Sequence, residues 1–530
     1  MSVAAASPIR TTPGRRAARP AVCSAEEAVD SIPVEGATIA LTGSGGGILE
    51  PDVLLDALER RWLLTAAPRG MTIVHALGIG DRKTRGTNHL AHAGMVTKVI
   101  GGHWTWSPTM IELVRDNTVA AHSLPAGAIS LLLREIGARR PGLITRTGLG
   151  TFVDPRNGGG RFNDAAQDEL VELIELDGDE YLRYKPFPVD VALVRGDTMD
   201  PAGNISCAHE AAQLDVLAVA QAAKASGGMV IAQVKTLSDT PLDPRQVHLP
   251  AVLVDRVVHA PAQQQTYAGE YDPALCGEAP AGPLIPASVD PVRQLIARRA
   301  AAEVHDGDVL NVGFGVSALV VDVLAEDRRL DTITLAIEQG LIGGVPTTGD
   351  LFGAARGPAV IHASTTQFDL FAGGVLDVCA LGMAQVGADG SVNVSRIAGG
   401  IVGPGGFIDI SQNAQRAIYC GTFTARGLDI EVADGRLHIR REGSVPKFVA
   451  EVDEVTYSGP LAVQEGREAI YVTERAVFTL TPDGLELTEV APGVDIERDI
   501  VAHMGFTPLI RDPRPMDAAL FAGVAAAAAR

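Results

Sequence analysis

The feature that most constrains the fold of this chain is a pattern of elements that occurs twice. In each copy a short helical segment is followed by a strand of apolar residues, a glycine-rich loop and a second helix with one apolar face. Short buried strands that alternate with helices are typical of parallel sheets covered by helices. The two copies therefore predict an α/β protein built from two related halves in tandem.

The first copy begins at Ser24, which forms a capping box with Glu27 at the start of a short helix. The strand is expected over residues 38–41, and the glycines of 43–47 form the loop. Pro51 then stands at the start of the second helix, where its missing N–H group costs nothing.

The second copy repeats this order about 270 residues later. Asp290 caps its first helix, the strand is expected over residues 309–312, and Gly313 and Gly315 form the loop. An apolar-faced helix follows from Leu319. The similarity between the copies is one of pattern, and it indicates a duplicated unit.

The chain has 530 residues, too many for one hydrophobic core. Between the copies lies a stretch rich in proline, glycine and alanine without periodicity, which is typical of a linker. We therefore expect an N-terminal domain over residues 23–260, a linker over 261–290 and a C-terminal domain over 291–522. Residues 1–22 are basic and rich in alanine and proline, which favours a disordered tail over a transit peptide.

Composition excludes several classes of function. The chain carries 44 basic and 64 acidic residues, a formal charge of −20, which disfavours binding to nucleic acid or to anionic membranes. No apolar run approaches the roughly 20 residues that a membrane helix needs. The five cysteines are scattered without a CxxC pair, so we expect reduced, mostly buried thiols in a cytoplasmic protein.

Three histidines raise the question of a metal site. His89 and His92 lie three residues apart, and His103 follows in a glycine-rich segment. Their spacing does not match the HExxH pattern, and the sequence offers no evident carboxylate to complete a site. We therefore predict hydrogen-bonded structural histidines and no metal.

A single carboxylate, Glu338, ends an apolar run that is expected to form a buried strand over residues 332–337. Gly340 and Gly343 follow and let the backbone approach whatever faces the glutamate. Ligands of open α/β sheets bind at the carboxyl ends of strands. These residues fit either a nucleophile or a salt-bridged or solvated glutamate at a strand end.

The glycine-rich loops alone leave two interpretations open. Neither 43–47 nor 313–315 fits a phosphate-binding loop or a dinucleotide fingerprint, so each is interpreted as a tight packing turn. The glycines of 399–411 fit a surface turn equally well as a set of N–H groups presented to a developing oxyanion.

Together, these segments resemble the class I CoA-transferases. The signature of that family, a glutamate followed by a small residue, glycine, two apolar residues and glycine, stands here at residues 338–343, with Gln339 in the second place. The sequence looks like the single-chain, short-chain acyl branch, which includes propionate and acetate CoA-transferases and is related to succinyl-CoA:3-ketoacid CoA-transferase. The resemblance covers residues 22–522, and its further segments are 78–104, 148–163, 389–395 and 404–414.

This resemblance implies two tandem, related three-layer α/β domains and an acyl-CoA:carboxylate CoA-transferase. Its substrates would be short-chain acids such as acetate, propionate, butyrate or acetoacetate, and the reaction would be ping-pong through a glutamyl-CoA thioester on Glu338. Coenzyme A would enter as the acyl-CoA cosubstrate, with no metal. The family also implies a homo-oligomer.

The resemblance assigns further site residues. The loop Gly313, Phe314, Gly315, Val316 and Ser317 is implied to contact CoA, and Gly405 and Gly406 are implied to supply backbone N–H groups near the thioester. One position departs from the pattern, because Ala126 stands where the family often has glutamine.

Other functions compete with simple transfer between acids. The nearest are an acyl-CoA hydrolase and a transferase specialised for a hydroxy or keto acid. A sensor that binds CoA or a sugar phosphate without turnover is the alternative from another class, and the intact Glu338 motif argues against it.

Overall fold

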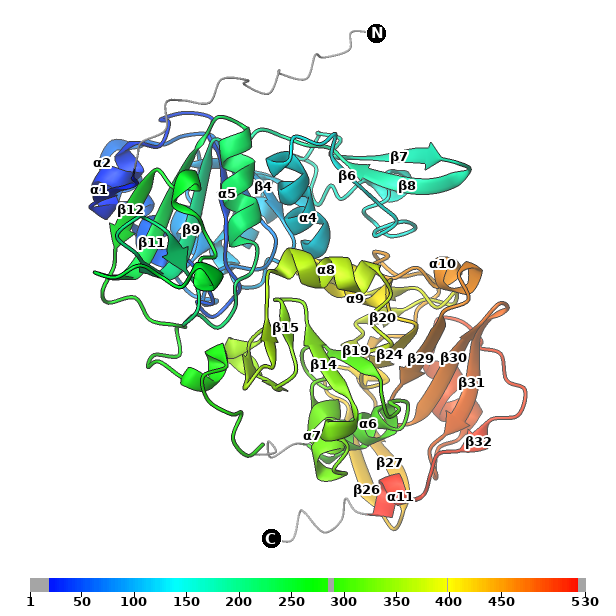
Figure 1. Ribbon diagram of the computed structural model, residues 1–530. Helices are drawn as coiled ribbons and strands as arrows, with labels where there is room; N and C mark the ends of the chain where they lie inside the picture. The colour runs from blue at the N-terminus through cyan, green and yellow to red at the C-terminus, as the bar shows by residue number, and fades with distance from the viewer. Residues whose placement is uncertain (1–18, 285–289, 398, 523–530) are drawn as a thin grey trace.

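The computed structural model describes residues 19–284, 290–397 and 399–522. Two large sheets dominate the molecule (Figure 1). Strands from residues 21–259 form the first sheet and strands from 309–515 form the second. We call the parts that carry them the N-terminal half and the C-terminal half. The prediction of two tandem α/β units is confirmed.

The sheet of the N-terminal half has nine strands in the order β1-β12-β11-β9-β2-β3-β4-β5, with β10 paired to β9. All neighbours are parallel except β9 and β10. The strands are β1 Ala21–Cys23, β2 Thr38–Leu41, β3 Met71–His75, β4 Val96–Gly101, β5 Ala120–Ser123, β9 Val191–Met199, β10 Ile205–Ser206, β11 Met229–Leu237 and β12 Arg256–His259.

The sheet of the C-terminal half has ten strands in the order β18-β15-β14-β13-β19-β24-β29-β30-β31-β32, parallel from β14 to β29. The strands are β13 Val309–Val312, β14 Thr334–Ile337, β15 Leu341–Ile342, β18 Val360–Ile361, β19 Val378–Gly382, β24 Arg416–Cys420, β29 Glu468–Val472, β30 Ala476–Thr481, β31 Gly484–Val490 and β32 Arg514–Pro515. Its central strands are buried runs of valine, isoleucine, leucine and alanine, as parallel strands covered on both faces require.

In each sheet there is one point from which successive strands are added on opposite sides. In the first sheet β2 leads to β3, β4 and β5 on one side, while β9 leads to β11 and β12 on the other. In the second, β13 leads to β14 on one side and β19 leads to β24 and β29 on the other. Right-handed crossovers on the two sides of such a point place helices on opposite faces and leave a crevice at the strand ends.

The helices are short to medium in length. They are α1 Ala25–Asp30, α2 Asp52–Thr65, α3 Pro108–Arg115, α4 Ala126–Gly137, α5 Val216–Ala225, α6 Pro291–Ala301, α7 Leu319–Glu326, α8 Ser364–Ala372, α9 Phe407–Ser411, α10 Gly459–Gln464 and α11 Ala519–Ala522. The Ser24–Glu27 capping box of α1 is present, and Asp290 caps α6 as expected.

Small sheets decorate both halves. A three-stranded antiparallel sheet projects from the N-terminal half, and five two-stranded ribbons belong to the C-terminal half (Figure 1). They are β6 Leu143–Thr145, β7 Val171–Leu176 and β8 Asp179–Tyr184, then β16 Val345–Pro346, β17 Ala355–Arg356, β20 Gln385–Val386, β21 Val392–Asn393, β22 Arg396–Ile397, β23 Gly400–Ile401, β25 Thr424–Ala425, β26 Asp429–Ala433, β27 Arg436–Arg441 and β28 Val445–Pro446.

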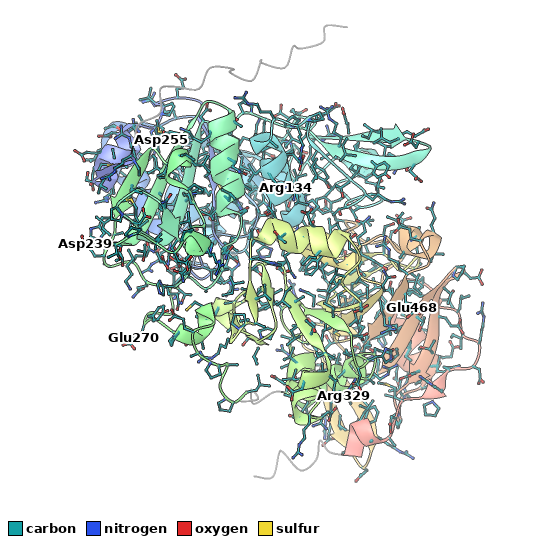
Figure 2. All side chains as sticks on the ribbon, viewed as in Figure 1. Arg134, Asp239, Asp255, Glu270, Arg329 and Glu468 are labelled. Atoms are coloured by element: carbon teal, nitrogen blue, oxygen red, sulfur yellow. The ribbon has the colours of Figure 1, made fainter. Side chains whose placement is uncertain are left out.

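The two halves meet where α8 and α9 of the C-terminal half pack against α4 of the N-terminal half (Figure 1). Arg134 on α4, labelled in Figure 2, lies at this junction. It forms an ion pair with Asp369 on α8. One hydrophobic cluster includes residues of both halves, so they share part of their core.

Two predicted boundaries need correction. The tail predicted for residues 1–22 cannot extend to residue 22, because β1 begins at Ala21 and pairs with β12; residues 1–18 lie outside the described part of the chain. The strand predicted over 332–337 begins at Thr334, since Leu330–Thr332 form a 3-10 turn.

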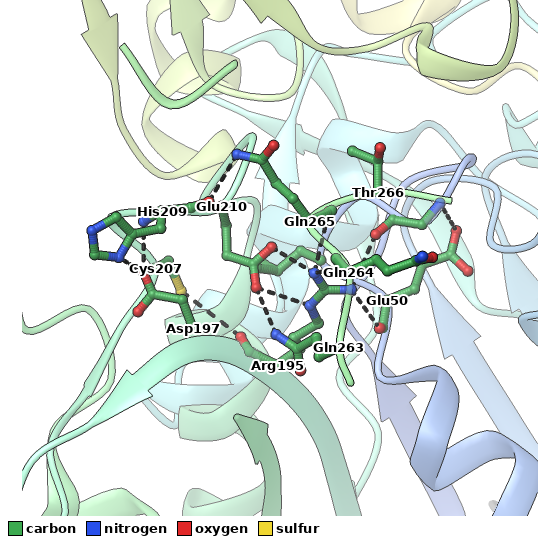
Figure 3. Close-up of polar contacts among 12 residues, drawn as sticks. Glu50, Arg195, Asp197, Cys207, His209, Glu210, Gln263, Gln264, Gln265 and Thr266 are labelled. Atoms are coloured by element: carbon green, nitrogen blue, oxygen red, sulfur yellow. Dashed lines mark hydrogen bonds and ion pairs between the residues drawn. The ribbon is translucent and has the colours of Figure 1, made fainter. Parts of the chain in front are cut away.

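The predicted linker is also less open than its composition suggests. Gln263, Gln265 and Thr266 are buried, and a 3-10 turn forms at Pro273–Cys276. Arg195 on β9 holds the start of this segment by donating to the backbone of Gln265 (Figure 3). These polar residues are buried by contacts with residues far away in the chain, and such contacts leave no local pattern in the sequence. The division into domains at 261–290 itself stays a prediction.

Candidate active site

The carboxyl ends of strands from both halves surround one large cavity of about 590 Å³. The N-terminal half contributes the turns that follow β2, β3 and β4, and the C-terminal half contributes the ends of β13, β14 and β19. Its larger apolar lining residues are Leu77, Trp106, Phe314, Phe352, Leu381, Met383, Val394, Ile397, Val402, Phe407 and Ile410. The cavity therefore lies at the crevice that the topology predicts for a ligand.

Glu338 lies in this cavity directly after β14. Only 7% of the residue is exposed, and within the described part of the chain it forms no ion pair. Burial raises the pKa of its carboxyl, and the side chains of Gln339 and Asn311 act in the opposite direction. Burial of a carboxylate without a cation costs folding free energy, so its presence here indicates a catalytic role.

Two amide side chains beside Glu338 carry unpaired oxygens. Gln339 Nε2 lies 3.4 Å from Glu338 Oε1 and 3.5 Å from Ser44 Oγ, while Asn311 Nδ2 donates to Ala336 O at 2.8 Å. Gln339 Oε1 and Asn311 Oδ1 are buried without a partner among the described residues. Because buried polar atoms are normally paired, these two acceptors fit a ligand that brings N–H or O–H groups.

The turn before α9 approaches Glu338 closely. A Cβ atom on Gly406 would lie 3.3 Å from Glu338 Cδ, so the backbone of Gly406 lies close to the carboxyl group. Within the described residues the Gly406 N–H has no acceptor, whereas the Gly405 N–H donates to Gly102 O at 2.8 Å. The Gly405 N–H is therefore already engaged and holds the turn to the N-terminal half, while the backbone contacts predicted for both glycines near the thioester stay predictions.

The predicted CoA-contacting loop reaches the cavity only at its start. Gly313 and Phe314 line the cavity, and Phe314 is 58% exposed with its ring edge-on to Phe352. Ser317 is fully buried and its hydroxyl donates to Phe314 O at 3.3 Å. Gly315 and Val316 do not line the cavity. The sequence pattern located the loop but not the side chains that face inward.

The first glycine-rich loop is a packing turn, as interpreted. A Cβ on Gly45 would lie 1.9 Å from the Trp106 ring, and one on Gly46 would lie 1.8 Å from Asp350 O of the C-terminal half. These glycines are required by the close approach of neighbouring groups. Ser44, directly before these glycines, faces the cavity next to Gln339.

Sequence reasoning missed the cation of the cavity. Arg82 lies over the Trp106 ring at 3.8 Å and its Nη1 pairs with Asp350 Oδ1 at 2.8 Å, so it spans the two halves. Among the described residues that line the cavity, Arg82 is the single lysine or arginine. Its place after a strand end, in the segment following β3, was the available signal.

The three histidines do not come together. His103 lines the cavity, where burial lowers its pKa to about 4 and its Nε2 contacts Thr105 Oγ1 at 2.7 Å. His89 and His92 instead bind Glu59 on α2 at 2.5 Å and 2.8 Å.

The histidines on Glu59 form an ion-pair cluster. Burial would lower the pKa of His89, but Asp52 and Glu59 raise it to about 9. Ligand atoms of Asp56, Glu59 and His89 also lie within 4.8 Å of one another, the composition of a candidate metal group. The hydrogen bonds from His89 and His92 engage both oxygens of Glu59.

Two further predictions concern the chain as a whole. All five cysteines are free, and four of them are buried. In the described ranges no helix combines the length and the apolar character that crossing a membrane would require.

Comparison with known proteins gives a consistent result. The family described as Coenzyme A transferase matches residues 22–260. The chain is 42% identical to acetate CoA-transferase YdiF of Escherichia coli O157:H7, over 96% of each chain, and 41% identical to caffeate CoA-transferase of Acetobacterium woodii, over 94% of this chain and 97% of that one.

A solved structure agrees with this relationship. The crystal structure of the acyl-CoA transferase YdiF from E. coli O157:H7, in a thioester complex with CoA, matches with a TM-score of 0.90 and 41% identity, and the match covers 95% of this chain and 96% of that one. The chain belongs to the coenzyme A transferase family.

Proposed function

We propose that this protein transfers coenzyme A between short-chain carboxylic acids and that Glu338 carries CoA between the two half-reactions as a γ-glutamyl thioester. The observation that carries the proposal is Glu338 itself, a buried carboxyl without a cation at the meeting point of strand ends from both halves. The thioester complex of YdiF with CoA supports it.

The first half-reaction moves CoA onto the enzyme. A carboxylate oxygen of Glu338 attacks the carbonyl carbon of acyl-CoA, the C–S bond breaks, and CoA leaves as thiolate. The thiolate then attacks the Glu338 Cδ of the resulting anhydride, the C–O bond breaks and the first acid leaves as a carboxylate. No proton transfer, metal or nucleotide triphosphate is needed, because one thioester replaces another.

The second half-reaction reverses these steps with a new acid. Its carboxylate attacks the Glu338 carbonyl carbon, CoA thiolate leaves, and the thiolate then attacks the acyl carbon of the second anhydride. Glu338 is released as a carboxylate together with the new acyl-CoA. The kinetics expected from this sequence are ping-pong.

Each attack places negative charge on a carbonyl oxygen next to the Gly406 turn. We assign the Gly406 N–H as the donor for this charge, since its backbone lies close to Glu338 and its N–H is not otherwise engaged within the described chain. A preorganised donor of this kind typically contributes about 3 kcal/mol. The Gly405 N–H is excluded from this role by its bond to Gly102.

The cavity fits the acyl end of a CoA thioester. It is large enough for a small ligand, and its aliphatic and aromatic lining suits an acyl chain and the pantetheine arm. The unpaired oxygens of Gln339 and Asn311 would accept from the amide N–H groups of that arm. Exclusion of water from such a lining protects the thioester from hydrolysis.

The proposal also covers the location of the protein in the cell and its assembly. Five free thiols support a reducing compartment, and we propose the cytoplasm. We also propose a homo-oligomer, as expected for the family. Fractionation of cells would test the first statement, and sedimentation of the purified protein the second.

The decisive experiment is a mass measurement. Treatment with acetyl-CoA is expected to add the mass of CoA, less one water, to the intact protein, and fragmentation is expected to place the addition on Glu338. The same treatment of Glu338→Ala should give no addition. Acceptor acids of two to six carbons should then discharge the adduct as the corresponding acyl-CoA. An adduct on another residue, or release without an acceptor acid, would overturn the proposal, the latter in favour of a hydrolase.

A further inference from the structure

A second buried carboxyl group lies close to the site and has no place in the steps above. Asp409 belongs to α9, three residues after Gly406, and is 4% exposed. Its Oδ2 accepts from the Gly127 N–H at 3.0 Å, at the amino end of α4. Among the described residues it forms no ion pair, so its partner is the backbone of the other half of the molecule.

The turn beside Asp409 is fixed to the same helix end. Gly405 O accepts from the Ala126 N–H at 2.8 Å, and the Gly405 N–H donates to Gly102 O at 2.8 Å. A Cβ on Gly127 would lie 2.4 Å from Asp409 Oδ1, so the carboxyl group is in direct contact with the helix end. These bonds join the turn that touches Glu338 to the N-terminal half.

We propose that Asp409 is a positioning residue for CoA transfer, which fastens the amino end of α4 to α9 and thereby holds the Gly406 backbone against Glu338. The proposal rests on the function proposed above. It adds that the geometry of the oxyanion donor is set across the junction between the halves, by a carboxyl group that touches neither the substrate nor CoA.

The charge state of Asp409 connects this role to pH. Burial raises its pKa to about 8; the Gly127 N–H opposes this rise and the Glu338 carboxyl adds to it. Among the described residues, the charge on Asp409 also acts on the Tyr184 phenol on β8, whose pKa is raised chiefly by burial and further by Asp409. On α4 and α8 the charged pair Arg134 and Asp369 bind each other.

Ionisation of Asp409 places a second negative charge near the oxyanion that forms at Glu338. Turnover by the wild-type enzyme is therefore expected to fall as the pH rises through about 8. An amide at position 409 keeps an acceptor for the Gly127 N–H but cannot ionise, so it should remove this fall.

The test compares Asp409→Asn and Asp409→Ala with Asp215→Asn as a matched control. Asp215 is equally buried, accepts from Ser130 Oγ of the same helix at 2.9 Å, has its pKa raised by burial to about 6, and does not line the cavity. The readouts are kcat and KM for acyl-CoA from pH 6 to 9.5 and the rate of CoA adduct formation.

Asp409→Asn is expected to keep kcat at pH 7 within a few-fold and to lose the fall above pH 8. Asp409→Ala is expected to lower kcat by about 10²-fold with KM little changed, as misplaced catalytic groups do. Asp215→Asn should retain the wild-type profile. An unchanged profile in Asp409→Asn overturns the inference, and that result is decisive even if the alanine variant does not fold.

The two proposals fail in different ways. If the wild-type protein forms no adduct on Glu338, the proposed function fails. If the wild type forms the adduct and both Asp409 variants form it at the wild-type rate, only the positioning role fails.

Discussion

Glu338 and Glu210 are both buried carboxyl groups, one in each half, and their surroundings differ sharply. Glu210 is 2% exposed and binds Arg195 through two hydrogen bonds of 2.9 Å and 2.8 Å, with Gln263 donating at 2.9 Å (Figure 3). Glu338 is 7% exposed and has one amide contact of 3.4 Å. Burial raises the pKa of both groups, and only in Glu210 does a cation oppose it.

The difference shows how the fold separates structural from reactive carboxylates. The oxygens of Glu210 are paired with donors, and the same guanidinium also donates to Gly47 O in the first glycine-rich loop and to Gln265 O in the segment after β12. Such a pair is lost only at a high cost, because each charge would leave the other uncompensated. The oxygens of Glu338 remain free to attack a carbonyl carbon.

Glu338→Gln gives the largest expected effect. The substitution keeps the shape of the side chain and removes the nucleophile, so kcat should fall on the order of 10⁴-fold or more, as for other covalent catalysts. The thermal midpoint should stay the same or rise, because a neutral amide is easier to bury than a carboxylate. Steady-state rates and thermal unfolding measure both. If Glu338→Gln kept more than a few per cent of the activity, Glu338 would not be the reactive one of the two glutamates.

Glu210→Gln is the matched change in the other half. It leaves Arg195 without its carboxylate, and the free energy of unfolding should fall by about 3–5 kcal/mol. The activity per folded molecule should be unchanged, since Glu210 does not line the cavity. Denaturant unfolding together with active-site titration by the CoA adduct tests this. A loss of turnover in the folded fraction would mean that the network also acts on catalysis.

Local signals allowed much of this molecule to be predicted. The strands predicted over 38–41 and 309–312 have these bounds in the structure. Both are apolar runs bounded by glycine and capping residues, which limit where a short strand can begin and end. The placement of Glu338 at a strand end followed from the same pattern.

The rest could not be predicted, because it depends on contacts between residues far apart in the chain. Asp409 and Gly127 are 282 positions apart, and nothing near either residue indicates the other. The engagement of the Gly405 N–H by Gly102 is equally nonlocal. A glycine motif shows where the backbone can approach a group, while the availability of its N–H depends on the whole fold.

Gly406→Ala should have a smaller effect that is confined to the site around Glu338. The backbone at Gly406 has φ −84°, which alanine adopts without strain, but the added Cβ would lie 3.3 Å from Glu338 Cδ. We expect kcat to fall about 10-fold to 10²-fold, up to the lower end of the range for a lost oxyanion donor, while the thermal midpoint changes little. Gly400→Ala on the nearby ribbon is a control outside the cavity. Equal rates in the two variants would remove Gly406 from the mechanism.

Gln339→Leu should give the smallest effect, visible as a change in pH dependence. Glu338 must be ionised to attack, and burial raises its pKa, so kcat/KM should decline on the acid side at a pH above the ordinary value of 4.5. The Gln339 amide lowers this pKa, so its removal should move the decline of kcat/KM to higher pH.

Gln213→Leu removes a partly buried amide outside the cavity, which donates to Ile361 O at 3.2 Å, and should leave the acid limb in place. If the decline of kcat/KM on the acid side moves to lower pH in Gln339→Leu, the unpaired Gln339 oxygen, and not the N–H group, faces Glu338. The amide would then repel the carboxylate, and the contrast with the fully paired Glu210 would be stronger, because Glu338 would have no stabilising side-chain donor at 3.4 Å.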